Sequence, residues 1–266
     1  MKILFTLLAL TLSVATFAQD FSGRATYQSK MILKDFNEKV AEDQSKISQD
    51  FIEAVKRASE KTFILEFTKE ESLYTEEQTL ELPIAEGKQK NRVILTSEDS
   101  GTLYKNIKEN YFILKNDRFN KINFIKDTLE TSGWELLTES KQIGNYTAYK
   151  ATKTIKREET VQNENREKNS NLLEMLDKKD PEDWVYVAWY TPQIPTPNGP
   201  GKFGGLPGLI LELHDPQQET IYLCSEIVLN PKKHIEIKVP KGKTISKEEF
   251  EKMKKEWYEK MSSQKY

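Results

Sequence analysis

The stretch GPGKFGGLPGLILEL, from Gly199 to Leu213, is the most informative part of the chain for the fold, because glycine and proline are concentrated in a loop that leads directly into an apolar run. The window from Pro192 to Gly208 holds five of the 11 glycines and five of the 10 prolines in the 266-residue chain. Proline fixes φ, and glycine permits conformations and close approaches that other residues cannot adopt. We therefore expect a loop of fixed shape that presses Phe203 and Leu206 inward, with Gly205 or Gly208 at positive φ or tight against a neighbouring backbone. The residues expected to set this shape are Gly199, Pro200, Gly204, Gly205, Pro207 and Gly208.

The segment before the loop, WVYVAWYT, is predicted to be a strand that is apolar on both faces. Its aromatic residues could line a binding pocket, since such pockets are mostly apolar with a few polar anchors. The competing interpretation is that they fill the core. The candidates for binding a ligand or a partner are Trp184, Tyr186, Trp189, Tyr190, Phe203 and Leu206.

The segments after the loop, LILEL and TIYLCSEIVL, are predicted to form a hairpin across the turn HDPQQE, whose Asp-Pro pair is a turn signal. In this hairpin one face is expected to carry Leu209, Leu211, Leu213, Ile221, Leu223 and Ile227. The reverse face is expected to carry Glu212, His214, Tyr222, Cys224 and Glu226.

Elsewhere the pattern is that of an antiparallel meander. DFSGRATYQSKMIL predicts a first strand with Ala25, Tyr27 and Ser29 on one face. Between Phe63 and Ile155 short apolar runs alternate with turn residues, which predicts about seven strands. The expected runs are TFILEFT, RVILTS, GTLYKNI, NYFILK, RFNKINFI, GWELLT and YTAYKATKTI.

Two helices are expected to pack on this sheet. Apolar residues recur every three or four positions from Val40 to Lys61, which predicts a helix. Residues 241–266 are expected to form a C-terminal amphipathic helix in which Ser246 and Glu249 make a capping box. Residues 156–183 are too polar to build a core and predict a surface excursion. The expected fold is α+β, a single curved, half-barrel-like antiparallel sheet in a domain spanning residues 19–240, with both helices on it.

The N-terminus has the layout of a secretory signal peptide, with Lys2, an apolar run and small residues before a cleavage site after Ala18. Residues 1–18 are therefore expected to be removed. The residue directly after that site, Gln19, is not a cysteine, and no later run is long enough to span a bilayer. We expect an exported protein without a lipid anchor or transmembrane segment, in the periplasm or alternatively outside the cell.

The composition argues against several chemistries. The 40 basic and 42 acidic side chains nearly balance, so nucleic acid is not an expected partner. The common zinc-hydrolase, redox and serine-hydrolase motifs are absent. No metal or cofactor is expected, and GPGKFGG is not a P-loop because it leads into a strand. An alternative is a periplasmic hydrolase or metal-dependent enzyme that uses His214, Glu212 or Cys224.

The tract from Trp184 to Leu213 resembles the GLPGLI family of exported Bacteroidetes proteins, which is named after the hexapeptide at Gly205–Ile210. The segment from Trp134 to Thr152 resembles a second, weaker block of that family. The family has no established activity, cofactor or catalytic residue. Its members are often encoded near TonB-dependent outer-membrane transporters, so the resemblance implies a role in the envelope.

These observations favour a non-enzymatic exported protein that binds an apolar ligand or an envelope protein partner, in association with a TonB-dependent transporter. The oligomeric state has no signature in the sequence.

Overall fold

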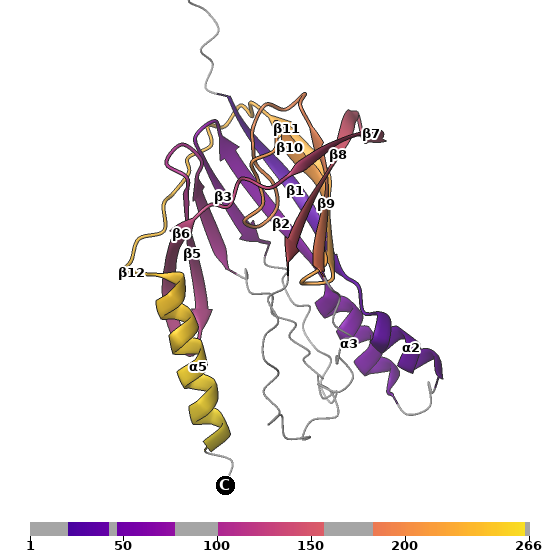
Figure 1. Ribbon diagram of the computed structural model, residues 1–266, viewed down its shortest axis with the longest axis vertical. Helices are drawn as coiled ribbons and strands as arrows, with labels where there is room; N and C mark the ends of the chain where they lie inside the picture. Colours follow the sequence, from indigo (N-terminus) through magenta and orange to yellow (C-terminus); the bar gives the residue numbers. More distant parts are fainter. Residues whose placement is uncertain (1–20, 43–46, 78–100, 157–182, 264–266) are drawn as a thin grey trace, which may run out of the picture.

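One large, open, mostly antiparallel sheet dominates the computed structural model, which describes residues 21–42, 47–77, 101–156 and 183–263 (Figure 1). Within these residues the sheet has 12 strands in the order β12-β6-β5-β4-β3-β2-β1-β11-β10-β9-β8-β7. All neighbours are antiparallel except β12, which runs parallel to β6. The strands are β1 (Ser22–Met31), β2 (Glu60–Thr68), β3 (Glu71–Glu76), β4 (Thr102–Asn106), β5 (Tyr111–Arg118), β6 (Lys121–Thr128), β7 (Glu135–Ile143), β8 (Tyr146–Lys156), β9 (Asp183–Thr191), β10 (Leu209–Asp215), β11 (Thr220–Leu229) and β12 (Thr244–Ile245).

The predicted meander is largely confirmed. Six of the runs expected between Phe63 and Ile155 form β2, β4, β5, β6, β7 and β8. The run RVILTS, the signal peptide and nearly all of the polar excursion lie outside the described residues. Strand β3 was not predicted, because its inner-face positions, Ser72 and Tyr74, do not form an apolar alternation.

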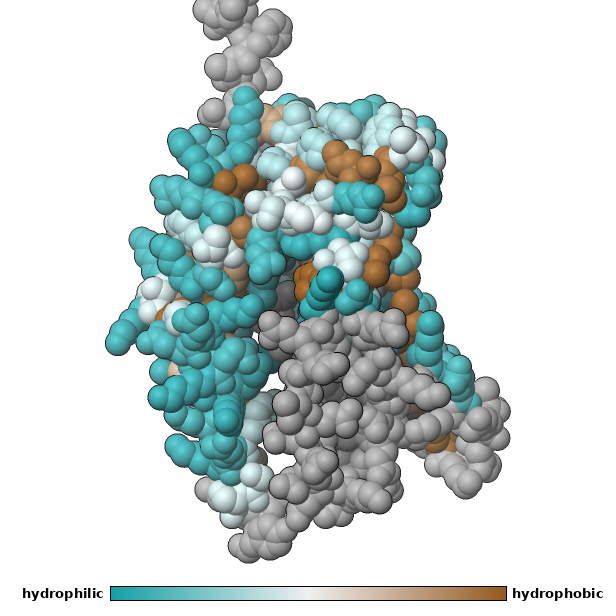
Figure 2. Space-filling model, in the orientation of Figure 1, coloured by the Kyte–Doolittle hydropathy of each residue, from teal (hydrophilic) through white to brown (hydrophobic). Residues whose placement is uncertain are grey.

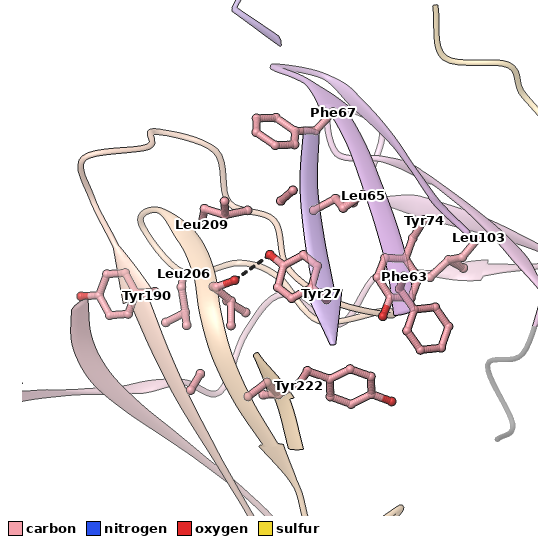
Figure 3. Packing of buried hydrophobic residues seen from close by; sticks show 14 of the residues in the cluster. Tyr27, Phe63, Leu65, Phe67, Tyr74, Leu103, Tyr190, Leu206, Leu209 and Tyr222 are labelled. Carbon is pink, nitrogen blue, oxygen red and sulfur yellow. Dashed lines mark hydrogen bonds between the residues drawn. The ribbon is translucent and has the colours of Figure 1, made fainter. Parts of the chain in front are cut away.

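The core lies on one face of the sheet, here called the inner face and defined by Ala25, Leu65 and Leu103, whose side chains are fully buried. Figure 3 shows aromatic and leucine side chains from several strands gathered on this face. Within it the Tyr27 hydroxyl donates to the Ile210 carbonyl oxygen at 2.7 Å. The expected placement of Ala25, Tyr27 and Ser29 on one face of β1 is confirmed, and this face is the inner one.

The predicted register of the β10–β11 hairpin was wrong by one residue. Leu213 pairs with Tyr222, and Glu212 pairs with Leu223. Four residues separate Asp215 from Thr220 in the turn, so each odd-numbered residue of one strand pairs with an even-numbered residue of the other. The length of the turn thus sets the register of the hairpin. Tyr222 and Cys224 therefore share the inner face with Leu213, whereas Glu212 lies on the outer face. Past a register shift in the β1–β11 pairing, Ile227 and Glu226 lie on the inner and outer faces, as predicted.

The fold is β-dominant rather than α+β, because the helices are few and cover little of the sheet (Figure 1). The helix predicted from Val40 to Lys61 is shorter and follows a separate one, α2 (Lys34–Glu42). Helix α3 (Gln49–Ser59) follows its N-cap residue Ser48, whose Oγ accepts from the Phe51 N–H, and it ends where β2 starts. Its apolar stripe forms a small cluster with α2 that contains Phe36, Ile52 and Val55 and lies apart from the main core, and α3 also contacts β1 and β2.

The C-terminal helix α5 (Lys247–Ser263) packs beside β6, as expected. Its capping box is confirmed, because the Ser246 N–H donates to Glu249 at 2.9 Å and the Glu249 N–H donates to Ser246 Oγ at 3.1 Å. Phe119, at the β5–β6 turn, contacts the rings of Phe250 and Trp257.

Candidate functional site

The loop Pro192–Gly208, here called the GLPG loop, lies against the inner face of the sheet and takes the place that a covering helix would occupy (Figure 1, orange segment between β9 and β10). Backbone hydrogen bonds fix its ends, from the Leu209 N–H to the Ile194 carbonyl and from the Ile210 N–H to the Asn198 carbonyl. The side chains of Ile194 and Leu206 are almost completely buried. The loop is therefore part of the core.

The expectation for the two glycines is confirmed. Gly205 has a φ of 83°, and a Cβ there would overlap the backbone carbonyl of Thr131. At Gly208 a Cβ would overlap the carbonyl of Thr191. Trp134 adds a further contact, because its indole N–H donates to the Gly204 carbonyl at 3.0 Å.

A buried lysine connects the GLPG loop to strand β4. Lys105, on the inner face of β4, is only 2% exposed. Its ammonium donates to the carbonyl oxygens of Gly199 and Gly201 at 2.9 Å and of Phe203 at 3.3 Å. Lysine has three N–H donors, so each has an acceptor, as burial of a charged group requires.

Lys105 is not among the site residues predicted above, although the sequence contains a signal for it. In GTLYKNI, Leu103, Lys105 and Ile107 alternate at a period of two, which places the lysine on the apolar face of a strand. A charged residue at such a position is almost never fully buried without partners. The partners here are almost a hundred residues further along the chain, so no local pattern identifies them.

A pocket of about 340 Å³ lies between the GLPG loop and the ends of β4 and β6. Its described lining residues are Lys105, Ile107, Asn110, Leu129, Thr131, Pro197, Asn198, Lys202, Phe203, Gly204 and Gly205. This volume is at the lower end of the range of small-molecule sites, about 300–1,000 Å³. The pocket therefore has the size for a small molecule rather than for a macromolecular segment.

Asn198 gives this pocket a polar group with unused capacity. The residue is 1% exposed, and its Oδ1 accepts from the Gly199 N–H at 2.9 Å. That bond fixes the orientation of the amide, because the oxygen must face the N–H. The Nδ2 group has no hydrogen-bond partner among the described residues. Buried donors without a hydrogen-bond acceptor are rare in native structures.

Charged side chains form part of the pocket wall. Of its described lining residues two are lysines and none is acidic. Lys202 is half-buried, and its ammonium lies 5.6 Å from the centre of the Phe112 ring. Phe112 is the direct cross-strand neighbour of Lys105 on the inner face.

The six binding residues predicted from the sequence do not lie together in the structure. Tyr186, Tyr190 and Leu206 are buried on the inner face, and of the six candidates only Phe203 lines the pocket. Phe203 contacts the Tyr186 ring at a centroid distance of 5.3 Å. Trp189 lies on the outer face under the Lys141 ammonium, 4.3 Å from the ring centre, and Trp184 is half-buried. The structure thus brings the candidates to both faces of β9 rather than to one site.

The residues of the alternative enzymatic site are also divided between the two faces. His214 Nε2 lies 3.1 Å from Glu212 Oε1 on the outer face, and Lys141 forms an ion pair with Glu212 at 2.7 Å. Cys224 lies on the inner face, where burial raises the pKa of its thiol to about 12. A thiol with such a pKa holds little of the nucleophilic thiolate at neutral pH. In the described ranges no group of three or more His, Cys, Asp or Glu side chains could hold a metal ion.

Residues 134–212 match one family model. It is described as "Protein of unknown function (Porph_ging)", and the matched range includes Trp134–Thr152 and most of Trp184–Leu213. No curated protein matches the chain.

Two solved structures of PNGF-II resemble this structure. The one in space group C2 has a TM-score of 0.44 and 16% identity, over 80% of this chain and 28% of that chain. The one in space group P21 has a TM-score of 0.49 and 13% identity, over 87% of this chain and 32% of that chain. The chain thus spans about a third or less of the length of these PNGF-II chains.

The described helices contain no segment with the length and apolarity that crossing a bilayer requires.

Proposed function

We propose that this chain is an exported, non-enzymatic protein of the GLPGLI type that binds a small, largely apolar ligand in the pocket beneath the GLPG loop. In this proposal the sheet curves like a half-barrel around the loop, and the protein works in the periplasm beside a TonB-dependent transporter. The signal-peptide pattern at residues 1–18 supports export.

The observation that carries the proposal is the pocket itself. Leu129 and Phe203 supply apolar surface, and the rigid loop and sheet hold that surface in place. Binding sites for small molecules are largely preformed, concave and apolar, with few polar anchors. The match to an uncharacterised family covers the GLPG loop and is consistent with a shared role for it.

Binding of a neutral fluorescent probe, N-phenyl-1-naphthylamine, to purified mature protein tests this proposal. We expect its fluorescence to rise and saturate with wild-type protein. The variant Thr131→Trp should abolish the rise, because Thr131 is exposed, lines the pocket and can carry a larger side chain that fills it.

Thr128→Trp is the matched control, since Thr128 is also exposed but is not among the lining residues. It should bind the probe like the wild type. Equal binding by Thr131→Trp and Thr128→Trp, with both variants folded by circular dichroism, would place the probe elsewhere and contradict the proposal.

The second candidate is binding of an envelope protein, such as the transporter, through the outer face. Val185 on β9, and Leu223 and Val228 on β11, lie on that face and are each more than 40% exposed. Figure 2 shows brown, hydrophobic surface on the side where β7, β8 and β9 lie. Co-purification of a membrane receptor that is lost on Val185→Asp, and kept in Thr131→Trp, would favour this candidate over ligand binding.

The enzymatic alternative with His214, Glu212 or Cys224 stays a prediction of the sequence. Unaltered turnover of a peptide and ester panel after replacement of all three residues would remove it.

A further inference from the structure

We propose that an exposed lysine patch at the β6 edge of the sheet binds the surface of an anionic lipid bilayer. The patch comprises Lys115 on β5, Lys126 on β6, and Lys241 and Lys243 in the segment before β12, together with the exposed side chain of Ile122 on β6. None of these residues lines the pocket beneath the GLPG loop, so this surface is independent of the ligand site proposed above.

The patch assembles around Phe124 on β6. Lys115 is the direct cross-strand neighbour of Phe124, and Ile122 and Lys126 lie two positions before and after it on β6. Residues two positions apart on a strand share a face. Because Ile125 is buried in the main core, the face that carries these side chains is the outer one.

The segment before β12 contributes the other two lysines. It runs along the side of the molecule where β6 lies (Figure 1). Gly242 lies directly against the Phe124 ring, so closely that a Cβ at Gly242 would overlap it. Lys241 and Lys243 flank Gly242 in the chain, and both are exposed. Four lysines from three parts of the chain are therefore gathered around one aromatic ring.

The positive charge of the patch is not neutralised by ion pairs. None of its four lysines forms an ion pair with any residue that the structure describes. At the outer positions of β5 and β6, which are described in full, Asp117 is the single acidic residue. Residues 231–243 contain five lysines and one glutamate, Glu236, which lies 3.9 Å from Lys238. In a chain with a net charge of −2, this is a local excess of positive charge.

The composition of the patch favours a lipid surface over other anions. All of its cations are lysines, and Ile122 is 53% exposed among them. Lysine is a flexible point charge that suits phosphates in variable positions, whereas arginine is preferred where an anion is bound in one fixed geometry. Anionic headgroups attract such lysines, and the layer beneath the headgroups accommodates an aliphatic side chain. A uniformly acidic polypeptide would match the lysines but would offer no apolar layer to Ile122.

Sedimentation with lipid vesicles tests the proposal. The experiment uses purified mature protein, because the apolar run within residues 1–18 would itself bind lipid. We expect binding to vesicles that mix phosphatidylglycerol with phosphatidylcholine, and none to vesicles of pure phosphatidylcholine. An increase in salt from about 0.1 M to about 1 M should release the protein, because the screening length falls from about 10 Å to about 3 Å.

A fourfold variant addresses the patch itself. It carries Lys115→Gln, Lys126→Gln, Lys241→Gln and Lys243→Gln. We expect it to bind the anionic vesicles at least about tenfold more weakly than the wild type, since each lysine near such a surface strengthens binding about fivefold.

The matched control removes the same charge at exposed positions elsewhere, on α2, α3, the β2–β3 turn and β8. It carries Lys34→Gln, Lys56→Gln, Lys69→Gln and Lys156→Gln. Its binding should stay within about twofold of the wild type, because these positions lie outside the surface that meets the bilayer.

Three results would overturn the proposal. The first is the absence of binding to the anionic vesicles, or equal binding to pure phosphatidylcholine. The second is an equal loss in the two fourfold variants, with both folded by circular dichroism, since total charge rather than the patch would then control binding. The third is binding to soluble polyglutamate without binding to vesicles, which would make the partner an acidic protein. None of these results affects binding of the fluorescent probe, so failure of this proposal and failure of the proposed pocket are distinguishable.

Discussion

Lys105 anchors the GLPG loop through a single ammonium that donates to three of the loop's carbonyl oxygens. We expect Lys105→Met to lower the free energy of unfolding by about 3 kcal/mol, because it leaves buried carbonyls without donors. Urea denaturation measures this loss. Lys115→Met, at an exposed position on the neighbouring strand β5, should change stability by less than about 0.5 kcal/mol. Similar losses in the two variants would contradict the anchoring role of Lys105.

Gly205 tests the shape of the loop. Alanine there should destabilise the protein by more than about 2 kcal/mol, because a positive φ and overlap with the Thr131 carbonyl act together. Gly144 also has a positive φ, of 57°, but a Cβ there meets no atom within 4 Å. Gly144→Ala should therefore lower the free energy of unfolding by only about 1 kcal/mol, because only the unfavourable backbone conformation contributes. Equal losses in thermal unfolding would show that the loop does not press on Thr131.

Among the secondary-structure elements, α5 is stabilised at its N-terminus by a capping box. Ser246→Ala removes the acceptor for the Glu249 N–H and should destabilise the helix by about 1 kcal/mol. Hydrogen exchange in the first turn of α5 should become faster. Ser262→Ala, at the other end of α5, changes no cap donor and should leave that turn unaffected. Unchanged exchange in Ser246→Ala would mean that packing on Phe119 alone holds the helix.

The elements also show what the sequence could predict. Period-two alternation was enough for β1, β4, β5 and β8, because their inner-face residues follow a local rule. The start of α3 could have been read from Ser48, which precedes Gln49 and Asp50 as an N-cap. The length of the turn before Thr220 could likewise have given the hairpin register. The strand β3 could not be found in this way, since Ser72 takes an inner-face position.

The candidate site was less predictable than the fold. The GLPG loop and Phe203 were identified from composition, but the pocket also needs Lys105, Leu129 and Asn198. These residues come together only when β4, the end of β6 and the loop pack on one face. No periodic pattern encodes contacts over such separations, so the sequence alone assigned the binding role mostly to residues that fill the core.

At the scale of the whole molecule, stability should depend on alkaline pH. Burial raises the pKa of Cys224 from its ordinary 9.0 to about 12, and it raises the pKa of Tyr27 well above 10.0. The native state thus holds these protons more tightly than the unfolded state does. Their stabilisation is complete below about pH 9 and is lost as pH rises toward 12 and beyond.

Urea unfolding at a series of pH values checks this dependence. We expect stability to fall from pH 9 upward, and Cys224→Ala to reduce the slope of that fall. A slope that is the same in Cys224→Ala and in wild-type protein would show that the thiol does not contribute.

Amide chemical shifts recorded by NMR during a titration with N-phenyl-1-naphthylamine test whether a small, largely apolar ligand binds beneath the GLPG loop. We expect saturable shifts at Asn110, Asn198, Lys202 and Gly204, which surround the pocket on both its sheet and its loop side. Shifts confined to the outer face, at Trp189 and Leu223, or no saturable shifts at all, would contradict this expectation.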